Sequence, residues 1–265
     1  MALTAIKHIP CFFNFRFSEE AFMKISVAMA AYNGESFILE QLASILNQLG
    51  EDDEVIVSVD PCQDNTMNIV TALAELDGRV KPVEGPGKGL IKNFENAISL
   101  CSGDIIFLSD QDDVWKEDKV KTVKERMLAA QADLLLHNCS LVDVFLNPIE
   151  GGESFFEARG SKAGFWKNYI KNSYMGCCMA FHKELMREFL PFPDCIPMHD
   201  QWIGLIAERC GATIVFEEKP LLLYRRHGGN VSETRHSSLP QMLRWRWNVL
   251  KALKSKSAAT KEVTR

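Results

Sequence analysis

The sequence predicts an α/β domain built around a largely parallel β-sheet. In its first half, short apolar runs of β type alternate with segments whose apolar residues recur at helical spacing. Polar clusters directly follow three of these runs, at the positions where ligands bind in open α/β sheets. The 265 residues, of which 46% are hydrophobic, can bury the core of one large domain.

The first half is interpreted as four strands separated by helices. Runs that contain Val and Ile predict the strands, at residues 25–31, 54–60, 79–83 and 104–109. A first helix follows from apolar residues at helical spacing, namely Phe37, Ile38, Leu42, Ile45 and Leu46. Asp64 and Thr66 are candidate caps of a second helix that ends at Leu76. A loop at residues 85–89 precedes a third helix at residues 90–100.

The second half continues without an internal repeat, so we expect it to elaborate the same domain. A charged helix at residues 116–130 is followed by a strand at 133–143 and by a stretch without clear pattern at 145–164. A strand at 177–182 precedes a helix from Lys183 and a Pro-rich loop at 191–197. The next helix, at 199–211, is closed by Gly211, and strands at 213–218 and 220–227 follow.

The two ends of the chain differ from this pattern. Residues 1–22 contain one short apolar patch broken by polar residues and Pro10, and we expect them to be an extension of a domain at residues 23–232. Residues 233–265 are predicted to form a basic helix or tail, because Glu262 is the single acidic residue from Arg244 onward. No stretch approaches the roughly 20 apolar residues that a membrane span needs.

Charge and cysteine content restrict the partners and the compartment. A formal net charge of -5 leaves no global basic surface, so we expect no nucleic-acid partner. The eight cysteines are scattered, with Cys177 next to Cys178 but no CxxC pair. This arrangement favours free thiols in a reducing cytoplasm over a disulfide framework.

Three carboxylates follow the predicted strand at residues 104–109. Asp110, Asp112 and Asp113 repel one another and raise one another's pKa values unless a cation neutralises them. Because carboxylate oxygens suit Mg²⁺ or Mn²⁺, we predict a divalent-cation site here. The alternative is that Asp112 or Asp113 caps a helix beginning at Trp115, but capping explains one carboxylate and not three.

Two further polar clusters, at residues 32–35 and 60–64, are expected at the same edge of the sheet. A cation held by carboxylates commonly binds a diphosphate and offsets its charge in a leaving group, which indicates nucleotide chemistry. The loop at residues 85–89 lacks the GxxxxGK[ST] pattern, and GxGxxG is absent after the first strand. A Walker-type ATPase and a Rossmann dehydrogenase are therefore disfavoured.

The chain resembles the family 2 glycosyltransferases of GT-A fold in a series of segments taken in order: SVAMAAYNGESFILEQLASILNQ, VSVDPCQDNT, KNFENAISLCSGDIIFLSDQDDVW, GCCMAFHKEL, MHDQW and YRRHGGNVS. The similarity covers roughly residues 24–232 and is nearest to the bacterial rhamnosyltransferase-like branch, which builds surface polysaccharide. It implies a Rossmann-like nucleotide-binding sheet flanked by helices, with an acceptor-side elaboration in the second half. The implied reaction is an inverting, metal-dependent transfer of a sugar from a dTDP- or UDP-linked donor to a glycan or lipid-linked acceptor.

This resemblance also assigns donor residues. Asp112 and Asp110 match the DxD motif, with Asp112 on the metal and Asp110 near the ribose or the metal's water shell. The residues implied to bind the donor nucleotide are Tyr32, Glu35, Asp60, Asn93 and Asp110. Around Asp60 the chain reads VDPCQD where relatives often read DDGSxD, so the loop near the base is expected to differ in shape.

The remaining assignments concern catalysis and the acceptor. Asp200 in MHDQW matches the general base, although it could also cap the following helix. His199 precedes it and is assigned to the acceptor and donor-sugar residues, where it either tunes Asp200 or acts as a hydrogen-bonding partner. Gly176 and Cys177 match the segment that lines the donor sugar and acceptor. His227 matches a histidine that approaches the metal or the diphosphate, with a turn residue before two glycines as the alternative.

The segment at residues 241–245, QMLRW, fits the QxxRW pattern of processive family members, but those enzymes carry membrane spans. We interpret the tail as a basic amphipathic helix that makes peripheral contact with anionic lipid, or that packs on the domain itself. Its apolar contacts would come from Trp245, Trp247, Val249, Leu250 and Leu253.

Two other functional classes stay open. A sugar nucleotidyltransferase would show a Gly-rich, basic loop directly after the first strand, where this chain has YNGE. An inactive nucleotide-sugar-binding protein would bind a donor without turnover, and the presence of both Asp112 and Asp200 argues against it.

Overall fold

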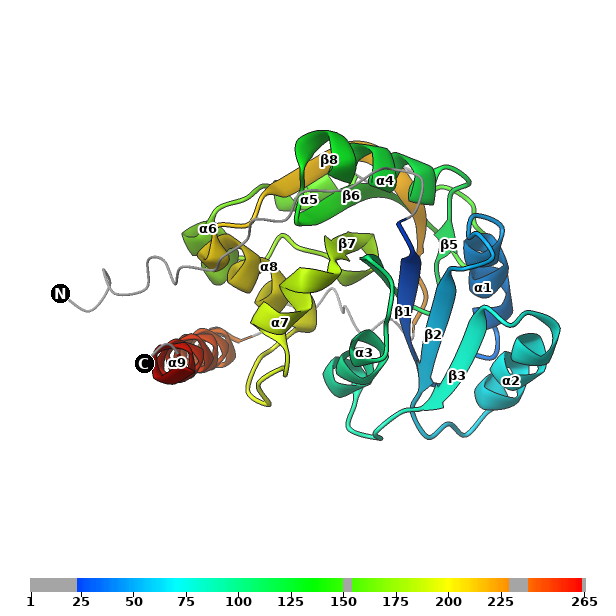
Figure 1. Ribbon diagram of the computed structural model, residues 1–265, viewed down its shortest axis with the longest axis horizontal. Helices are drawn as coiled ribbons and strands as arrows, with labels where there is room; N and C mark the ends of the chain where they lie inside the picture. The colour runs from blue at the N-terminus through cyan, green and yellow to red at the C-terminus, as the bar shows by residue number, and fades with distance from the viewer. Residues whose placement is uncertain (1–22, 150–153, 229–237, 264–265) are drawn as a thin grey trace.

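The computed structural model describes residues 23–149, 154–228 and 238–263 (Figure 1). The extension predicted at residues 1–22 lies outside these ranges, as do residues 229–232 of the YRRHGGNVS segment. Within the described ranges, helices cover both faces of a central sheet (Figure 1), which confirms the predicted α/β class.

The described strands form one sheet of eight strands in the order β3-β2-β1-β4-β7-β6-β8-β5. They are β1 (Ile25–Ala31), β2 (Glu54–Val59), β3 (Val80–Glu84), β4 (Ile105–Ser109), β5 (Val114–Trp115), β6 (Leu134–Val142), β7 (Met179–His182) and β8 (Ile214–Arg225). The sheet is mostly parallel, because β7 and β5 supply its antiparallel pairs.

β1 lies at the centre of the parallel half. It pairs in parallel with β2 and β4, and β2 pairs in parallel with β3. Ala31 lies opposite Val59 and Met29 lies opposite Ser109, so the carboxyl ends of the three strands meet at one edge. The polar clusters predicted after these strands therefore start from the same edge.

The helices named in Figure 1 are α1 (Ile38–Leu46), α2 (Thr66–Leu76), α3 (Leu90–Ser99), α4 (Lys119–Ala130), α5 (Phe155–Arg159), α6 (Phe165–Ile170), α7 (Met186–Phe189), α8 (His199–Cys210) and α9 (Leu239–Val263). Alternate residues of β1 enter two hydrophobic clusters. Val27 and Met29 share one cluster with Ile38 of α1, whereas Ala28 shares the other with Phe94 of α3. Burial on both faces explains why β1 is apolar throughout.

The sheet is curled, so that its last strand returns toward the first helix. β5 lies at the edge beyond β8, yet the Trp115 backbone N–H donates a hydrogen bond to Ser44 Oγ of α1 at 3.0 Å. The Trp115 ring also packs on Phe107 of β4, with ring centroids 5.4 Å apart. Residues 110–113 therefore connect the middle of the sheet to its edge across the curl.

Several predictions for the second half were wrong in detail. The strands predicted at 213–218 and 220–227 are one strand, β8, whose pairing with β6 is irregular around Asn138. The charged helix begins at Lys119 and not at Lys116, because residues 114–115 pair with β8. The unpatterned stretch contains α5, which begins with a capping box of Ser154 and Glu157. α6 was not predicted from the sequence. The helix expected from Lys183 is a short helical turn that is followed by α7.

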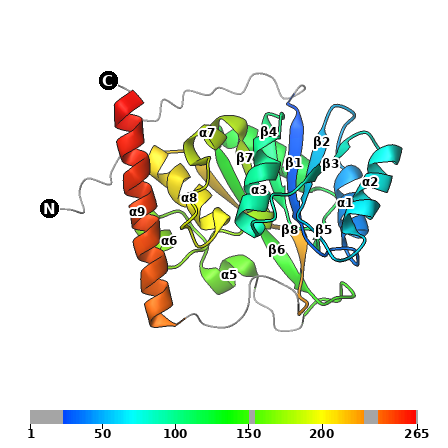
Figure 2. The ribbon, with the colours of Figure 1, turned by 90° about the horizontal axis from the view of Figure 1, so that it is seen from below.

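α9 packs along one side of the molecule, beside α6 and α8 (Figure 2). Val249 and Leu253 are buried against the domain, and Arg209 Nη1 of α8 donates to the Leu253 carbonyl at 2.7 Å. Tyr169 Oη of α6 donates to the Arg246 carbonyl at 3.0 Å. This face of α9 therefore packs on the domain and does not contact lipid, as the second interpretation of the tail predicted. None of the helices in the described ranges combines the length and hydropathy needed to cross a membrane.

Candidate active site

A cavity of about 500 Å³ opens at the carboxyl edge of β1, β2 and β4. Most of the residues selected from the sequence line it, namely Tyr32, Asp60, Asn93, Asp110, Asp112, Gly176, Cys177, His199 and Asp200. Glu35 and His227 are not among its lining residues. Because the lining comes from both halves of the chain, the whole curled domain is required to build it.

The turn at residues 110–113 is held to the end of β1 by Gln111. Its amide oxygen accepts from the Tyr32 backbone N–H, and its amide nitrogen donates to the Tyr32 carbonyl, both at 2.8 Å. Gly34 makes room for this side chain, since a Cβ there would lie 2.2 Å from Gln111 Oε1. The sequence placed Gln111 inside the acidic motif, but its positioning role was not predicted.

Arg225, at the end of β8, holds the other end of the same turn. Its backbone N–H donates to Asp113 Oδ1 at 3.0 Å, and its side-chain Nε donates to the Asp112 carbonyl at 2.9 Å. The guanidinium also bonds the Val144 carbonyl and pairs with Glu40 of α1. The Arg225 side chain is almost fully buried, so it stabilises the fold around this turn.

Asp113 does not cap a helix beginning at Trp115, which was the alternative interpretation of this motif. The residues after it form β5, and α4 begins only at Lys119, with Asp118 at its N-cap position. Asp113 is fully buried, and its Oδ2 has no hydrogen-bond partner in the structure. Burial raises the pKa of Asp113 well above its usual value, with repulsion from Asp112 and Asp110 adding to the effect.

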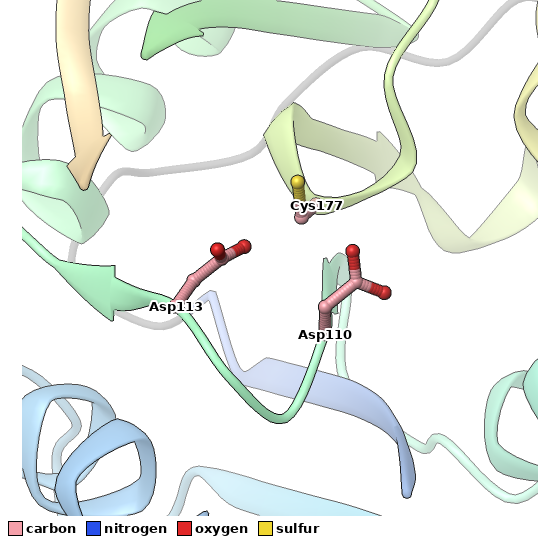
Figure 3. Close-up of side chains that lie close together, drawn as sticks. All are labelled: Asp110, Asp113 and Cys177. Carbon is pink, nitrogen blue, oxygen red and sulfur yellow. The ribbon is translucent and has the colours of Figure 1, made fainter. Parts of the chain in front are cut away.

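Acidic side chains near residues 110–113 form two contacts that bear on the predicted metal site. Asp112 Oδ2 lies 2.7 Å from His227 Nε2, so these two predicted ligands are in contact although they are far apart in the sequence. Ligand atoms of Asp110, Asp113 and Cys177 lie within 4.8 Å of one another, and Figure 3 shows the two carboxylates beneath the Cys177 segment. Burial, and next the charge of Asp112, raise the pKa of Asp110 to about 7.

Carboxylate oxygens and an imidazole nitrogen are donors that Mg²⁺ and Mn²⁺ accept, whereas a thiol is a soft ligand. Asp110 and Asp112 line the cavity, but Asp113 does not. The structure pairs Asp112 with His227 and groups Asp110 with Asp113 and Cys177, and among the described residues no hydrogen bond or ion pair joins Asp110 to His227. By donor type, the carboxylates and His227 suit the predicted metal better than the thiol of Cys177.

Asp60 is engaged by the loop at residues 85–89. Its carboxylate accepts from the backbone N–H groups of Gly87 at 2.8 Å and Gly89 at 3.3 Å. Both glycines have positive φ, at 65° and 83°, which L-residues with a side chain rarely adopt. The loop that lacked a phosphate-binding pattern thus closes over the end of β2 and shapes the cavity around Asp60.

Asn93 and Glu35 differ in how they relate to the cavity. Asn93 Nδ2 donates to the Ala31 carbonyl at 3.1 Å, while its buried Oδ1 has no partner and the residue lines the cavity. Glu35 lies outside the lining, and its carboxylate accepts from the Asn65 backbone N–H at 2.9 Å. The structure therefore brings Asn93 to the predicted nucleotide site and leaves Glu35 at the start of α2.

Asp200 reaches the cavity from the first turn of α8. Asn172 Nδ2 donates to its Oδ1 at 3.1 Å, and the Gln201 backbone N–H donates to the same oxygen. The residue is 8% exposed, and burial raises its pKa to about 6. A carboxylate with this pKa is largely ionised at neutral pH and is a stronger base than an exposed aspartate.

His199 packs beneath Gly176, and neither of its buried ring nitrogens has a hydrogen-bond partner among the described residues, so the prediction that it acts as a hydrogen-bonding partner was wrong. Its ring stacks on Phe94 with centroids 4.2 Å apart, and a Cβ on Gly176 would lie 2.5 Å from its Nε2. Burial lowers the pKa of His199 to about 3, so the ring is neutral. Gly176 is therefore required by a close approach to His199, a role in addition to the predicted one.

Lys119 is a site residue that the sequence did not reveal. It is fully buried, its Nζ donates to the Cys177 carbonyl at 3.0 Å, and the same atom lies 4.0 Å from the centroid of the Trp115 ring. Burial lowers its pKa to about 8. Lysine is rarely buried and usually marks a solvated helix face, so no pattern in a charged helix signals such a position.

The QxxRW-like segment lies away from this cavity. Gln241, Arg244 and Trp245 line a separate hollow together with residues of the 194–196 loop. That hollow shares no lining residue with the cavity around Asp200. Within the described residues, the segment therefore has no contact with the candidate active site.

The fold matches solved glycosyltransferases. S. aureus TarS 1-349 in complex with UDP-GlcNAc matches with a TM-score of 0.67 at 19% identity, over 88% of this chain and 66% of that chain. Glucosyl-3-phosphoglycerate synthase from Mycobacterium tuberculosis, crystallised with Mn²⁺, UDP and phosphoglyceric acid, matches with a TM-score of 0.55 at 21% identity, over 89% of this chain and 79% of that chain. The fold class is that of the GT-A glycosyltransferases.

Sequence comparison then identifies the family. The family model described as Glycosyl transferase family 2 matches residues 26–190. The dTDP-rhamnosyl transferase RfbG of Shigella flexneri is 29% identical over 216 residues, which cover 76% of this chain and 72% of that protein. The chain belongs to glycosyl transferase family 2 and is a glycosyltransferase, as the resemblance predicted.

Proposed function

We propose that this glycosyltransferase transfers a single sugar, with inversion, from a dTDP- or UDP-linked donor to a glycan or lipid-linked acceptor of a surface polysaccharide. The proposal depends on one observation. Asp200 lines the same cavity as Asp110 and Asp112 of the turn at residues 110–113, which we call the aspartate-rich turn. An inverting displacement needs one base and a stabilised diphosphate, and the cavity has residues suited to both tasks.

Asp200 is the proposed base. Its carboxylate takes the proton from the acceptor hydroxyl while that oxygen attacks the anomeric carbon of the donor sugar. The new glycosidic bond forms as the bond to the diphosphate breaks, and the electron pair leaves with the diphosphate. Asn172 orients the carboxylate through its hydrogen bond to Oδ1, and burial in α8 keeps the base poorly hydrated.

Asp110, Asp112 and His227 are the proposed ligands of Mg²⁺ or Mn²⁺. When bound, such a cation offsets the negative charge of the departing diphosphate. Without a cation, burial, and next the charge of Asp112, disfavour the ionised form of Asp110 and raise its pKa to about 7. The Mn²⁺ in the matched mycobacterial enzyme supports this assignment.

Tyr32, Asp60 and Asn93 are the proposed nucleotide contacts. The exposed ring of Tyr32 borders the cavity and offers a face to the base, and the unpartnered Asn93 Oδ1 offers an acceptor. The UDP of the matched structures and the dTDP in the name of the RfbG relative support these two nucleotides as donors. The reshaped loop around Asp60 is the place where preference between them would be set.

We further infer a cytoplasmic location, peripheral to the inner face of the membrane. All seven cysteines of the described residues are free thiols, in keeping with a reducing compartment. A lipid-linked acceptor would be met at the membrane surface.

A donor screen tests the proposal directly. The protein is incubated with dTDP- and UDP-sugars and Mn²⁺ or Mg²⁺, and the released nucleoside diphosphate is measured with and without glycan acceptors. We expect turnover with at least one donor, and its loss in Asp112→Ala. Binding of a donor by calorimetry without turnover, whichever acceptor is supplied, would favour the inactive binding protein. Formation of a nucleotide-sugar from a sugar phosphate and a nucleoside triphosphate would favour the nucleotidyltransferase.

A further inference from the structure

The outward face of α9 carries large apolar side chains that remain mostly exposed in the described structure. Leu239, Leu243 and Trp247 are 76%, 62% and 57% exposed. Their spacing of four residues places them along one stripe of the helix, because each residue advances by about 100°. The predicted lipid contacts at Val249 and Leu253 belong to the opposite, buried face, so they are not available.

Two neighbouring elements define the limits of this stripe. On one flank, Arg246 Nη2 donates to the Ile170 carbonyl of α6 at 2.9 Å, and Figure 2 shows α6 beside α9. α6 itself exposes Trp166 (41%) and Ile170 (56%). On the other flank, Cys195 of the 194–196 loop bonds the Asn248 carbonyl. The open face of α9 lies between these two contacts, with its apolar half toward α6.

The basic half of the same face carries Arg244, Lys251 and Lys254. All three are exposed, and Lys251 Nζ lies 5.7 Å from the Trp247 ring, so charge and apolar surface are adjacent. Residues 239–256 contain five basic residues and no acidic residue. Because the whole chain has a net charge of -5, the residues outside this segment carry a formal charge of -10. Residues 239–256 therefore carry a net positive charge on an otherwise acidic molecule, and they also carry the exposed apolar stripe.

We propose that the face of α9 formed by Leu239, Leu243, Trp247, Arg244, Lys251 and Lys254 docks on the surface of a membrane that contains anionic phospholipid. Leucine and tryptophan side chains enter the boundary between head groups and acyl chains, while lysine and arginine meet the lipid phosphates. The acidic remainder of the molecule is repelled by such a surface, which fixes the orientation of docking.

A second copy of the chain is a poorer occupant of this face. A symmetric dimer through α9 would place the same basic residues of both copies against one another, and like charges across an interface disfavour association. An anionic surface instead complements every exposed charge on this face of α9. The proposal does not depend on the proposed function, because lipid binding is measured without donor or acceptor.

Vesicle sedimentation of the full chain tests the proposal. Vesicles of phosphatidylcholine alone are compared with vesicles that also contain phosphatidylglycerol. We expect binding to the anionic vesicles that weakens as salt is raised. The double variants Leu243→Ser/Trp247→Ser and Lys251→Glu/Lys254→Glu should each bind about tenfold more weakly.

Matched controls come from equally exposed residues elsewhere. Leu76→Ser on α2 removes a leucine that is 86% exposed, and Lys121→Glu on α4 reverses an exposed charge. Both should bind within about twofold of the unmodified protein. Circular dichroism of every variant confirms that the fold is kept.

Three outcomes would overturn the proposal. The first is absence of binding of the unmodified protein to anionic vesicles. The second is an equal loss of binding in the Leu76 and Lys121 controls. The third is a dimer, detected by light scattering, that Leu243→Ser/Trp247→Ser converts to a monomer, which would make this face an interface between copies of the chain.

Discussion

Replacing Asp200 by asparagine should strongly lower kcat and at the same time stabilise the fold at neutral pH. Burial raises the pKa of this carboxyl from 3.8 to about 6, so folding disfavours its ionised form. Asparagine keeps the side-chain shape and the Oδ1 atom that accepts from Asn172 and Gln201, but it carries no charge. The variant therefore removes the catalytic base and also the free-energy cost of burying its negative charge.

The size of the stability effect follows from the two pKa values. The folded protein binds the proton more tightly than the unfolded chain, so stability falls as the pH rises from 3.8 to about 6 and is constant above that range. The difference corresponds to at most about 3 kcal/mol of unfolding free energy at neutral pH, and to almost nothing below pH 3.8. Loss of a general base lowers kcat by about 10²–10⁴-fold.

Urea denaturation at pH about 4 and about 7.5, together with initial rates, measures both effects. We expect Asp200→Asn to be more stable than the unmodified protein at the higher pH only. The exposed Asp52→Asn is the matched control and should change neither quantity. An unchanged rate in Asp200→Asn, or lower stability at both pH values, would refute the argument that a buried carboxylate is kept for catalysis.

Three further predictions concern the aspartate-rich turn. Asp112→Asn and His227→Gln should each weaken Mn²⁺ binding at least about tenfold in calorimetry, and unchanged affinity in both would remove them from the metal site. Arg225→Lys should lower the free energy of unfolding by about 3 kcal/mol, since lysine cannot reproduce the several buried hydrogen bonds of the guanidinium, and a change below about 0.5 kcal/mol would contradict this reading. Gly34→Ala should displace the Gln111 side chain and raise the KM for the donor while the fold is kept, so a loss of stability without a change in KM would argue against a positioning role.

The parallel half of the sheet could be predicted because its signals are local. β1 and β2 are buried throughout and appear as uninterrupted apolar runs, and their ends carry the polar residues of the cavity. Because the carboxyl ends of parallel strands meet at one edge of a sheet, Asp60 and Asp110 could be placed at the same edge before the structure was known. The order of the strands along that edge was not predicted.

The features that escaped prediction depend on contacts between distant residues. β5 is two residues long and exists because it pairs with β8, more than one hundred positions away. Asp113 is buried by the same pairing, so its sequence neighbours suggested a helix cap instead. Lys119 lies in a helix rich in charges, and only the curl of the sheet places its ammonium group under Cys177.

The four residues of the aspartate-rich turn have a mechanical consequence for the whole molecule. β4 and β5 are separated by three other strands in the sheet, yet residues 110–113 are the whole connection between them. In a flat sheet these two strands would lie about 19 Å apart, which exceeds the roughly 18 Å that a fully extended connection of this length can span. A connection of this length therefore fits a curved sheet and not a flat one. The curvature of the sheet and the position of the acidic side chains thus depend on the same four residues, so an insertion in this turn should alter both together.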